Sequence, residues 1–174
     1  MFFLQMSGFP GSGKSSLAKL LAKRTGAIVI DHDIVKTALI ESLEFAIDPK
    51  IAGKISYNID WSLAEYYLSQ QNSVILDSPC LYNEMIEKGQ RLCTKFGTNY
   101  KYVECYLNDF TEINRRLKQR KRMQSQLSEA TEENFSITIN NSKKPSDTYG
   151  LIVDSSKPLH SYVNEVIEYI NSKD

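Results

Sequence analysis

"MSGFPGSGKSS", residues 6–16, is the stretch of this 174-residue chain that decides its fold. It fits the pattern G-x-x-x-x-G-K-S/T at Gly8, Gly13, Lys14 and Ser15. Short patterns arise by chance, so the surrounding sequence matters. Here an apolar run that predicts a strand, Phe2–Ser7, comes before the loop, and leucines at helical spacing follow it. A strand, a glycine-rich loop and a helix in this order predict a phosphate-binding loop.

The residue types of this loop explain how it would bind phosphate. Glycines let backbone N–H groups turn toward the phosphates, and the N-terminus of the next helix adds positive potential. A lysine can reach the β and γ oxygens, and a serine hydroxyl can ligate Mg²⁺. A glycine-rich turn that only caps a helix would not need the Lys-Ser pair. We predict that the loop binds ATP through Gly8, Phe9, Pro10, Gly11, Ser12, Gly13, Lys14, Ser15 and Ser16, with Ser15 as a magnesium ligand.

Apolar and amphipathic segments alternate along the whole chain. The apolar segments that predict strands are Phe2–Ser7, Ala27–Asp31, Ser73–Asp77, Tyr102–Leu107 and Tyr149–Asp154. Helices are predicted between them, one of which carries an apolar stripe at Ile51, Ile55, Ile59, Leu63 and Tyr67. Parallel strands need crossover helices, which cover both faces of a sheet. The sequence therefore predicts a three-layer α/β/α fold with a five-stranded parallel sheet.

The composition narrows the class of protein. The 21 Lys and Arg residues balance the 21 Asp and Glu residues, which argues against a protein built mainly to coat nucleic acid but allows a local basic patch. The three cysteines, Cys80, Cys93 and Cys105, have no metal or redox spacing, so we expect reduced thiols. The opening "MFFLQM" is too short for a signal peptide or a membrane span. We expect one cytoplasmic domain over residues 1–174; the sequence does not indicate its oligomeric state.

Two acids follow the second predicted strand, in "VIDHDIVK" (residues 29–36). The carboxyl ends of parallel strands form the ligand-binding edge of such a sheet. Transfer of a phosphoryl group to a hydroxyl needs a carboxylate that orients the acceptor and takes its proton. Asp33 suits that role, and Asp31 could hold a metal-bound water. Alternatively, one of the two acids caps a helix that starts at Ile34. His32 is interpreted as structural or solvent-facing.

A third acid ends the strand "SVILD" (residues 73–77). In a site with a phosphate-binding loop, an acid at the end of such a strand holds Mg²⁺ through water. Many strands end in aspartate, so the pattern is weak alone. Together with the glycine loop it predicts Asp77 as a metal residue.

Six cations are packed into "INRRLKQRKRMQSQ" (residues 113–126). Most basic runs are simply solvated helix faces. This one comes directly before a polar stretch with little periodicity, so we predict an arginine-rich lid at about residues 120–148. Arg116 and Arg120 lie four residues apart and share a helix face. One could stack on the base while Arg120 stabilises charge in the transition state. A nucleic-acid patch is the rival interpretation, although the run lacks interleaved aromatics.

The polar turn "DSSKP" (residues 154–158) follows the fifth predicted strand. In this architecture such a turn lies near the nucleotide base, which makes Ser155 a candidate nucleotide-binding residue. A plain turn is an equally good interpretation.

These segments together resemble the P-loop kinase family with the nucleoside-monophosphate-kinase-like fold. The most similar groups are small kinases with AAA-type ATP-binding domains, which are grouped with polynucleotide kinase, gluconate kinase, shikimate kinase and chloramphenicol phosphotransferase. The resemblance covers nearly the whole chain, and only its first motif is highly specific. The motifs "GFPGSGKSS", "DHDIVK", "SVILDSP", "RRLKQRKR" and "IVDSS" occur in the family's order. The resemblance implies the strand order 2-3-1-4-5.

The resemblance also implies roles for individual residues. By analogy Lys14 and Ser15 would bind phosphate and Mg²⁺, and Asp33 would be the acceptor-binding base. Asp33 with Lys36 resembles the Asp-x-x-Arg of polynucleotide kinase, with lysine here in place of arginine. Arg116 and Arg120 resemble the base-stacking and lid arginines of adenylate and gluconate kinases.

Three functions are compatible with these observations. The leading one is transfer of the γ-phosphate of ATP·Mg²⁺ to a hydroxyl of a small molecule, with Tyr57 as a further acceptor-binding residue because its ring could stack on the acceptor. Core packing explains that ring equally well. The second is a 5′-hydroxyl kinase for nucleic acid. The third is an ATP-binding regulator with little turnover. The chain lacks N-K-x-D, and it has "DSPC" where a GTPase would have D-x-x-G.

Overall fold

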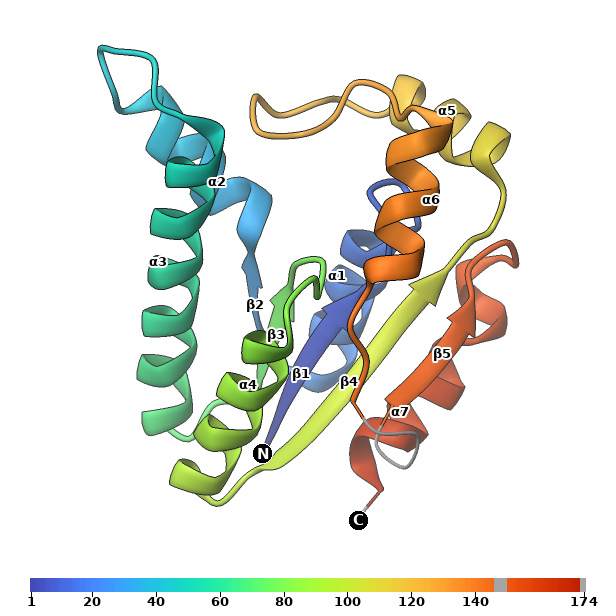
Figure 1. The fold of residues 1–174 in the computed structure, drawn as a ribbon. Helices are drawn as coiled ribbons and strands as arrows, with labels where there is room; N and C mark the ends of the chain where they lie inside the picture. The colour runs from blue at the N-terminus through green and yellow to red at the C-terminus, as the bar shows by residue number, and fades with distance from the viewer. Residues whose placement is uncertain (146–149, 173–174) are drawn as a thin grey trace.

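The computed structural model, which describes residues 1–145 and 150–172, contains a five-stranded parallel sheet (Figure 1). The strands lie in the order β2-β3-β1-β4-β5. Both the number of strands and their order confirm the prediction. Their bounds are β1 Phe2–Ser7, β2 Ile28–Asp31, β3 Val74–Asp77, β4 Asn99–Tyr106 and β5 Gly150–Asp154.

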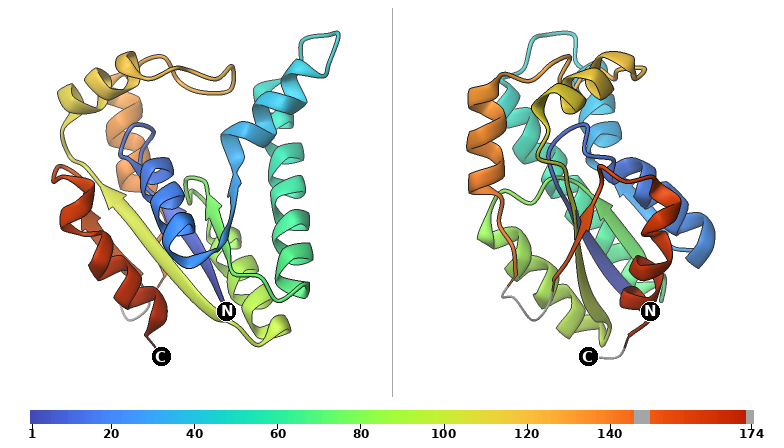
Figure 2. Two further views of the ribbon diagram at one scale, coloured as in Figure 1. Left: turned by 180° about the vertical axis from the view of Figure 1, so that it is seen from behind. Right: turned by 90° about the vertical axis from the view of Figure 1, so that its right-hand side faces the viewer.

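Helices cover both faces of this sheet (Figure 2). They are α1 Lys14–Thr25, α2 His32–Glu41, α3 Pro49–Ser69, α4 Asn83–Phe96, α5 Phe110–Gln119, α6 Glu132–Asn141 and α7 Val163–Asn171, with a short 3-10 helix at Leu159–Ser161. α1 and α7 lie on one face, and α3 and α4 lie on the other. Among the described helices, none is both long enough and apolar enough to cross a bilayer.

The central strand β1 shows why the sheet needs both layers. Phe2, Leu4 and Met6 point to the face covered by α1 and α7. Phe3 points to the opposite face and packs against Trp61 of α3, with ring centroids 5.8 Å apart. All six residues of β1 are buried, as expected for a central parallel strand.

The register of the strands brings the candidate residues to one edge. Asp31 and Asp77 are paired across β2 and β3, and each is the last residue of its strand. β1 lies next to β3 and ends at Ser7, immediately before the glycine loop. Parallel strands therefore deliver the loop and both acids to the same edge of the sheet, as the sequence predicted.

One helix forms within the segment that was expected to be irregular. Thr131 caps α6 by accepting a hydrogen bond from the backbone N–H of Asn134. Of the side chains of α6, Phe135 is buried, and its ring meets the ring of Phe9 edge-on, with centroids 5.0 Å apart. A helix that buries so little apolar surface has no periodic signal in the sequence. Residues 146–148 of the expected lid and Tyr149 of the expected strand lie outside the described residues.

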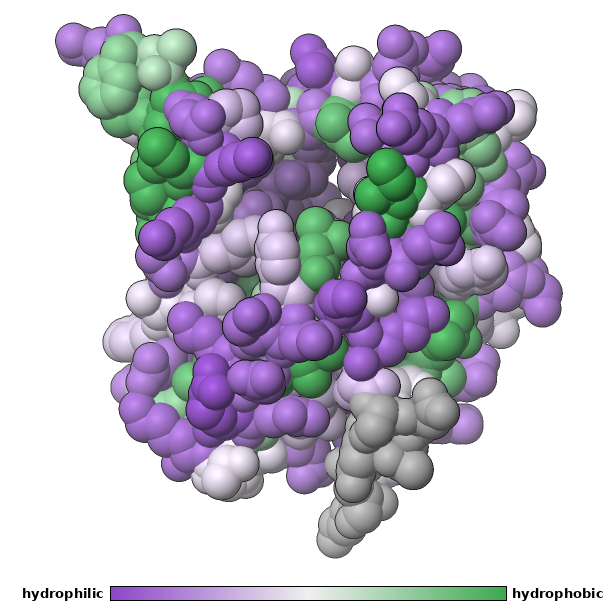
Figure 3. Space-filling model, viewed as in Figure 1, coloured by the Kyte–Doolittle hydropathy of each residue, from purple (hydrophilic) through white to green (hydrophobic). Residues whose placement is uncertain are grey.

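The predicted helix over residues 51–67 is present as α3, but its apolar stripe is not its buried face. Ile51 and Ile55 are 54% and 37% exposed. The buried residues of α3 are Ala52, Ser56, Asp60, Trp61, Ala64 and Leu68. Figure 3 shows the corresponding hydrophobic surface over the upper part of α3 and the α2–α3 connection. Small side chains let α3 approach its neighbours closely, which leaves the isoleucines outside.

The three cysteines are free, as expected, and all are buried. Burial raises the pKa of each thiol, to about 12 for Cys80. They are therefore unreactive core residues.

Candidate active site

The glycine loop connects β1 to α1, and three of its residues have backbone angles that favour glycine. φ is 130° at Gly8, 89° at Gly11 and 96° at Gly13. The backbone N–H of Ser12 donates to the carbonyl of Phe9 at 3.0 Å and closes the turn. The loop thus has the tight, left-handed curvature that a phosphate cradle requires.

Gly8 also lies too close to its neighbours for a side chain. A Cβ atom there would be 2.4 Å from the backbone oxygen of Cys105 and 2.7 Å from Oγ of Ser12. Because the first neighbour is backbone, the strain cannot be relieved by a rotamer change. We expect Gly8→Ala to lower the free energy of unfolding by about 3 kcal/mol in urea titrations.

Gly53→Ala provides a matched control for this prediction. Gly53 lies inside α3, and only the flexible Nζ of Lys36, at 3.9 Å, is near its Cβ position. Alanine in a helix interior should raise stability by up to about 1 kcal/mol. Equal stability of Gly8→Ala and wild type would show that the loop tolerates a side chain there.

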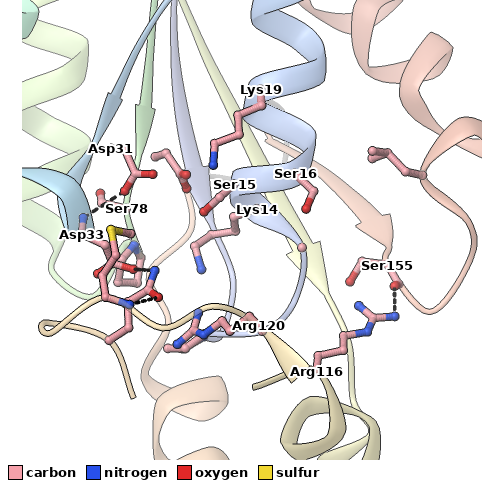
Figure 4. Close-up of a pocket in the computed structure, with 18 of the residues that line it drawn as sticks. Lys14, Ser15, Ser16, Lys19, Asp31, Asp33, Ser78, Arg116, Arg120 and Ser155 are labelled. Carbon is pink, nitrogen blue, oxygen red and sulfur yellow. Dashed lines mark hydrogen bonds between the residues drawn. The ribbon is translucent and has the colours of Figure 1, made fainter. Parts of the chain in front are cut away.

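Lys14 and Ser15 occupy the first turn of α1 and point into the space beside the loop (Figure 4). Lys14 is 8% exposed, and its Nζ donates to the carbonyl oxygens of Gly8 at 2.8 Å and Phe9 at 3.3 Å. The ammonium group is therefore held over the cradle, where it can neutralise the charge of a bound phosphate.

Asp31 caps α2, which is one of the two alternatives that the sequence left open. Its Oδ1 accepts from the backbone N–H groups of Asp33 at 3.0 Å and Ile34 at 3.4 Å. The helix consequently begins at His32, two residues before the expected start. Burial, together with the charge of Asp33, raises the pKa of Asp31. The second carboxylate oxygen remains available for a metal-bound water.

Asp77 is the acid that best fits a magnesium ion. Its side chain is 4% exposed, and Oδ2 is buried with no hydrogen-bond partner among the described residues. Burial raises its pKa to about 6, although Lys14 and a hydrogen bond from Ser15 oppose the shift. An orphaned carboxylate oxygen beside a hydroxyl is a donor set for a hard cation.

The described residues include no cluster of three or more His, Cys, Asp or Glu that could hold a metal ion. A cation at Asp77 would therefore complete its shell with water and phosphate oxygens, as Mg²⁺ does in phosphoryl-transfer sites.

Asp33 stands in the first turn of α2, half-buried at the wall of the cleft. Its Oδ2 accepts a hydrogen bond of 2.9 Å from Nε2 of Gln126. Gln126 belongs to the α5–α6 loop (residues 120–131), so this contact joins segments more than 90 residues apart. Asp33 thus faces the cleft with one oxygen already engaged.

Two arginines also line the site (Figure 4). Arg116 donates from Nε to Glu112 at 2.7 Å and from Nη2 to the carbonyl of Ser155 at 3.0 Å. Arg120 donates from Nη2 to the carbonyl of Leu127 at 2.9 Å. Burial lowers the pKa of the Arg120 guanidinium, while the charge of Asp33 opposes the shift. Both guanidinium groups are held in place before any ligand arrives.

A cleft of about 590 Å³ joins these groups, and Figure 3 shows a hydrophilic hollow between the α2–α3 and α5–α6 sides of the molecule. The lining includes twelve of the predicted residues: Pro10, Gly11, Gly13, Lys14, Ser15, Ser16, Asp31, Asp33, Asp77, Arg116, Arg120 and Ser155. The remaining loop residues, Gly8, Phe9 and Ser12, do not line it; Phe9 and Ser12 are buried.

Ten lining residues were missed by sequence reasoning: Lys19, Ser78, Pro79, Lys121, Met123, Gln126, Lys157, Pro158, Leu159 and Tyr162. Lys19 could have been found, because it lies one helical turn after Ser15 and Ser16. Ser78 directly follows Asp77. Met123 and Gln126 fall within the predicted lid, but no feature of the sequence singles out either residue.

Two predicted acceptor residues do not line the cleft. The ring of Tyr57 stacks on His32, with centroids 4.0 Å apart and planes at 19°, and its hydroxyl donates to the carbonyl of Pro79. His32 is itself buried, with Nδ1 2.6 Å from Oδ2 of Asp60. Lys36 lies against Gly53 of α3. These side chains form packing behind the cleft wall.

The glycine loop, the paired strand-end acids and the strand order define a P-loop protein with the nucleoside-monophosphate-kinase-like fold. The chain belongs to the AAA domain family, whose match covers residues 4–144. No curated protein matches the chain.

Solved structures of kinases share this fold. A protein of Chloroflexus aurantiacus J-10-fl, whose own assignment as a kinase is provisional, has a TM-score of 0.78 at 16% identity, with 97% of each chain covered. The APS kinase CysC of Mycobacterium tuberculosis, solved with AMPPNP and APS, has a TM-score of 0.64 at 18% identity and covers 98% of each chain. A gluconokinase of Sinorhizobium meliloti 1021 has a TM-score of 0.62 at 16% identity, covering 97% of this chain and 91% of its own.

Proposed function

We propose that the protein is an ATP-dependent phosphotransferase that moves the γ-phosphate of ATP·Mg²⁺ to a hydroxyl of a small molecule. The observation that carries the proposal is that Lys14, Asp33, Asp77 and Arg120 line one cleft. A nucleotide-binding regulator would need the phosphate cradle but not a half-buried carboxylate facing it. Transfer to a hydroxyl needs both.

The nucleotide would bind between α1 and the β5–α7 connection. Residues 8–16 and the N-terminus of α1 bind the phosphates, and Lys14 neutralises the β and γ oxygens. Arg116, held by Glu112 and by the carbonyl of Ser155, lies on the side where the base would stack. Ser15 and Asp77, with Asp31 through water, would hold Mg²⁺, which supplies charge neutralisation at the phosphates.

Asp33 would act on the acceptor. Its carboxylate orients the acceptor hydroxyl and takes its proton as the oxygen–Pγ bond forms. The bond between Pγ and the β–γ bridging oxygen breaks, and its electrons leave with ADP. Arg120 would neutralise charge on the γ oxygens in the transition state.

The acceptor is proposed to be a small molecule. The relatives named as gluconokinase, sugar kinase and APS kinase suggest sugars, sugar acids and nucleotides as the first candidates. Five of the six cations of the basic run already have an ion-pair or hydrogen-bond partner within the protein, so their charge is partly satisfied without a nucleic acid. Their partners lie within α5, the α5–α6 loop and Ser155, and the five are Arg115, Arg116, Lys118, Arg120 and Arg122. We place the reaction in the cytoplasm, where free thiols remain reduced.

The experiment is a transfer assay with γ-³²P-labelled ATP and pools of sugars, sugar acids, nucleosides, APS and 5′-hydroxyl oligonucleotides. Wild type should label a small molecule. Asp33→Asn should bind MgATP as wild type does but transfer about a thousandfold more slowly, since the proton acceptor is lost. Wild-type rates in Asp33→Asn would remove Asp33 as the base. Labelled oligonucleotide would favour the nucleic-acid kinase, and tight ATP binding without any transfer would favour the regulator.

A further inference from the structure

The α5–α6 loop is tied to the rest of the molecule at its base. Asn114 of α5 makes two hydrogen bonds with Ala130, from Nδ2 to the carbonyl at 3.2 Å and from the backbone N–H to Oδ1 at 2.7 Å. Arg120 adds a bond to the carbonyl of Leu127. The loop is therefore a structured connection rather than a loose one.

The tip of this loop is a tight turn from Met123 to Gln126. The backbone N–H of Gln126 donates to the carbonyl of Met123 at 3.1 Å. The side chain of Gln126 turns back as well, since its Oε1 accepts from the backbone N–H of Met123 at 3.2 Å. That second bond determines which way the amide points, because a flipped amide would set two donors against each other. The NH₂ group must face away from Met123.

That NH₂ group faces α2. Nε2 of Gln126 donates to Oδ2 of Asp33 at 2.9 Å, and Oγ of Ser125 donates to the backbone carbonyl of Asp33 at 3.0 Å. Thr37, one turn further along α2, bonds to Ser125 through its hydroxyl at 2.8 Å and accepts from the Ser125 backbone N–H at 3.3 Å. Four hydrogen bonds thus join this turn to the first two turns of α2.

We infer that Gln126 is a positioning residue for phosphoryl transfer: it holds the carboxylate of Asp33 in one orientation through Oδ2 and leaves Oδ1 for the acceptor hydroxyl. The inference rests on the proposed function. A half-buried aspartate has a broad, two-fold torsion at its carboxylate, so without a partner its oxygens exchange positions. A fixed donor removes that freedom, and misplacement of a reacting group is costly in rate.

The same turn shapes the acceptor side of the cleft. Met123 and Gln126 both line it, as does Pro79 on the β3–α4 connection. An acceptor bound at Asp33 would therefore lie beside this turn. The proposed proton acceptor, Asp33 of α2, and the part of the cleft wall formed by the α5–α6 loop are therefore joined by hydrogen bonds.

The test compares Gln126→Glu with Gln124→Glu, two isosteric changes of equal charge on the same turn. Gln124 is exposed and does not line the cleft. The Gln126→Glu change removes the amide donor of Gln126 and places a second carboxylate beside that of Asp33. Hydrogen–deuterium exchange should then rise by about tenfold in residues 121–128 and in α2. Gln124→Glu should exchange as wild type does.

Transfer from γ-³²P-labelled ATP to the sugar and nucleoside pools is the second measurement. In Gln126→Glu, kcat should fall by at least about tenfold while the KM for MgATP stays unchanged, and Gln124→Glu should match wild type. Combined with Asp33→Asn, the Gln126 change should have little further effect, because the two residues act as a unit.

The outcomes separate the two proposals. Unchanged exchange in Gln126→Glu, or a kcat equal to wild type, overturns the positioning role even if the protein is a kinase. A faster reaction also overturns it, since the turn would then obstruct the acceptor. Increased exchange in a protein that labels no pool confirms the contact between the turn and α2 and places the failure in the proposed function.

Discussion

Lys14→Ala is expected to reduce phosphoryl transfer by about a thousandfold and to weaken MgATP binding by about tenfold to a hundredfold. The physical reason is that the ammonium group is buried beside the glycine loop, where it would contact a bound phosphate directly. Its bonds to the carbonyls of Gly8 and Phe9 hold it there before nucleotide binds. Calorimetry with AMPPNP and Mg²⁺ gives the affinity, and the labelled-ATP assay gives the rate.

Lys23→Ala is the matched control, because Lys23 lies on the same helix but is exposed in its last turn. Its affinity and its rate should equal those of wild type. If Lys14→Ala binds AMPPNP as tightly as Lys23→Ala does, the glycine loop is not the phosphate site.

Asp77→Asn is expected to have opposite effects on the empty and the nucleotide-bound protein. At pH 7 the empty variant should be more stable than wild type by up to about 3 kcal/mol, which is several degrees in Tm. The reason is that wild type must bury an ionised carboxylate whose Oδ2 has no partner among the described residues. Asparagine keeps the shape without the charge. Thermal unfolding followed by circular dichroism measures the difference.

The pH dependence of that difference follows from the raised pKa of Asp77. The pKa is about 6 in the folded protein, compared with an ordinary value of 3.8. Between these values the folded state holds the proton more tightly than the unfolded state, so the Asp77 contribution to stability is lost as pH rises. The advantage of Asp77→Asn should thus be full above pH 6 and vanish near pH 4.

Added MgATP should reverse the ranking. Wild type gains stability by binding the nucleotide, whereas Asp77→Asn lacks the carboxylate that would hold the metal, so its Tm should rise less. A variant that is stabilised by MgATP as much as wild type is would show that Mg²⁺ does not depend on Asp77. An empty variant less stable than wild type at pH 7 would contradict the raised pKa.

Much of the fold follows from local patterns in the sequence. The spacing of Gly8, Gly13 and Lys14 predicts the phosphate-binding loop. The alternation of strands with helices predicts a parallel sheet. The position of Asp31 and Asp77 at one edge of the sheet follows from the same logic, since both acids end parallel strands, whereas their pairing depends on β2 lying next to β3. The roles of these residues are predictions that the experiments above test.

Other features depend on contacts between segments that are distant in the sequence. For some of these features, the sequence pattern predicts a different arrangement from the one in the structure. The isoleucine stripe of α3 predicts an apolar face, but α3 buries Asp60, whose Oδ2 lies 2.6 Å from Nδ1 of His32 of α2. Tyr57 was expected to contact the acceptor, but it stacks on the same histidine. A buried polar group is stable only when its partner is in place, and that partner comes from another helix.

The sequence alone determined the parts of this protein that depend on neighbours in the chain: the glycine loop, the strands and the acids at their ends. Only the tertiary structure decided which face of α3 is buried, and that Gln126 of the α5–α6 loop contacts Asp33 of α2. The physical reason is that backbone preference and hydrophobic periodicity act over a few residues. A hydrogen bond between residues 33 and 126 forms only after the sheet has brought α2 and the α5–α6 loop together.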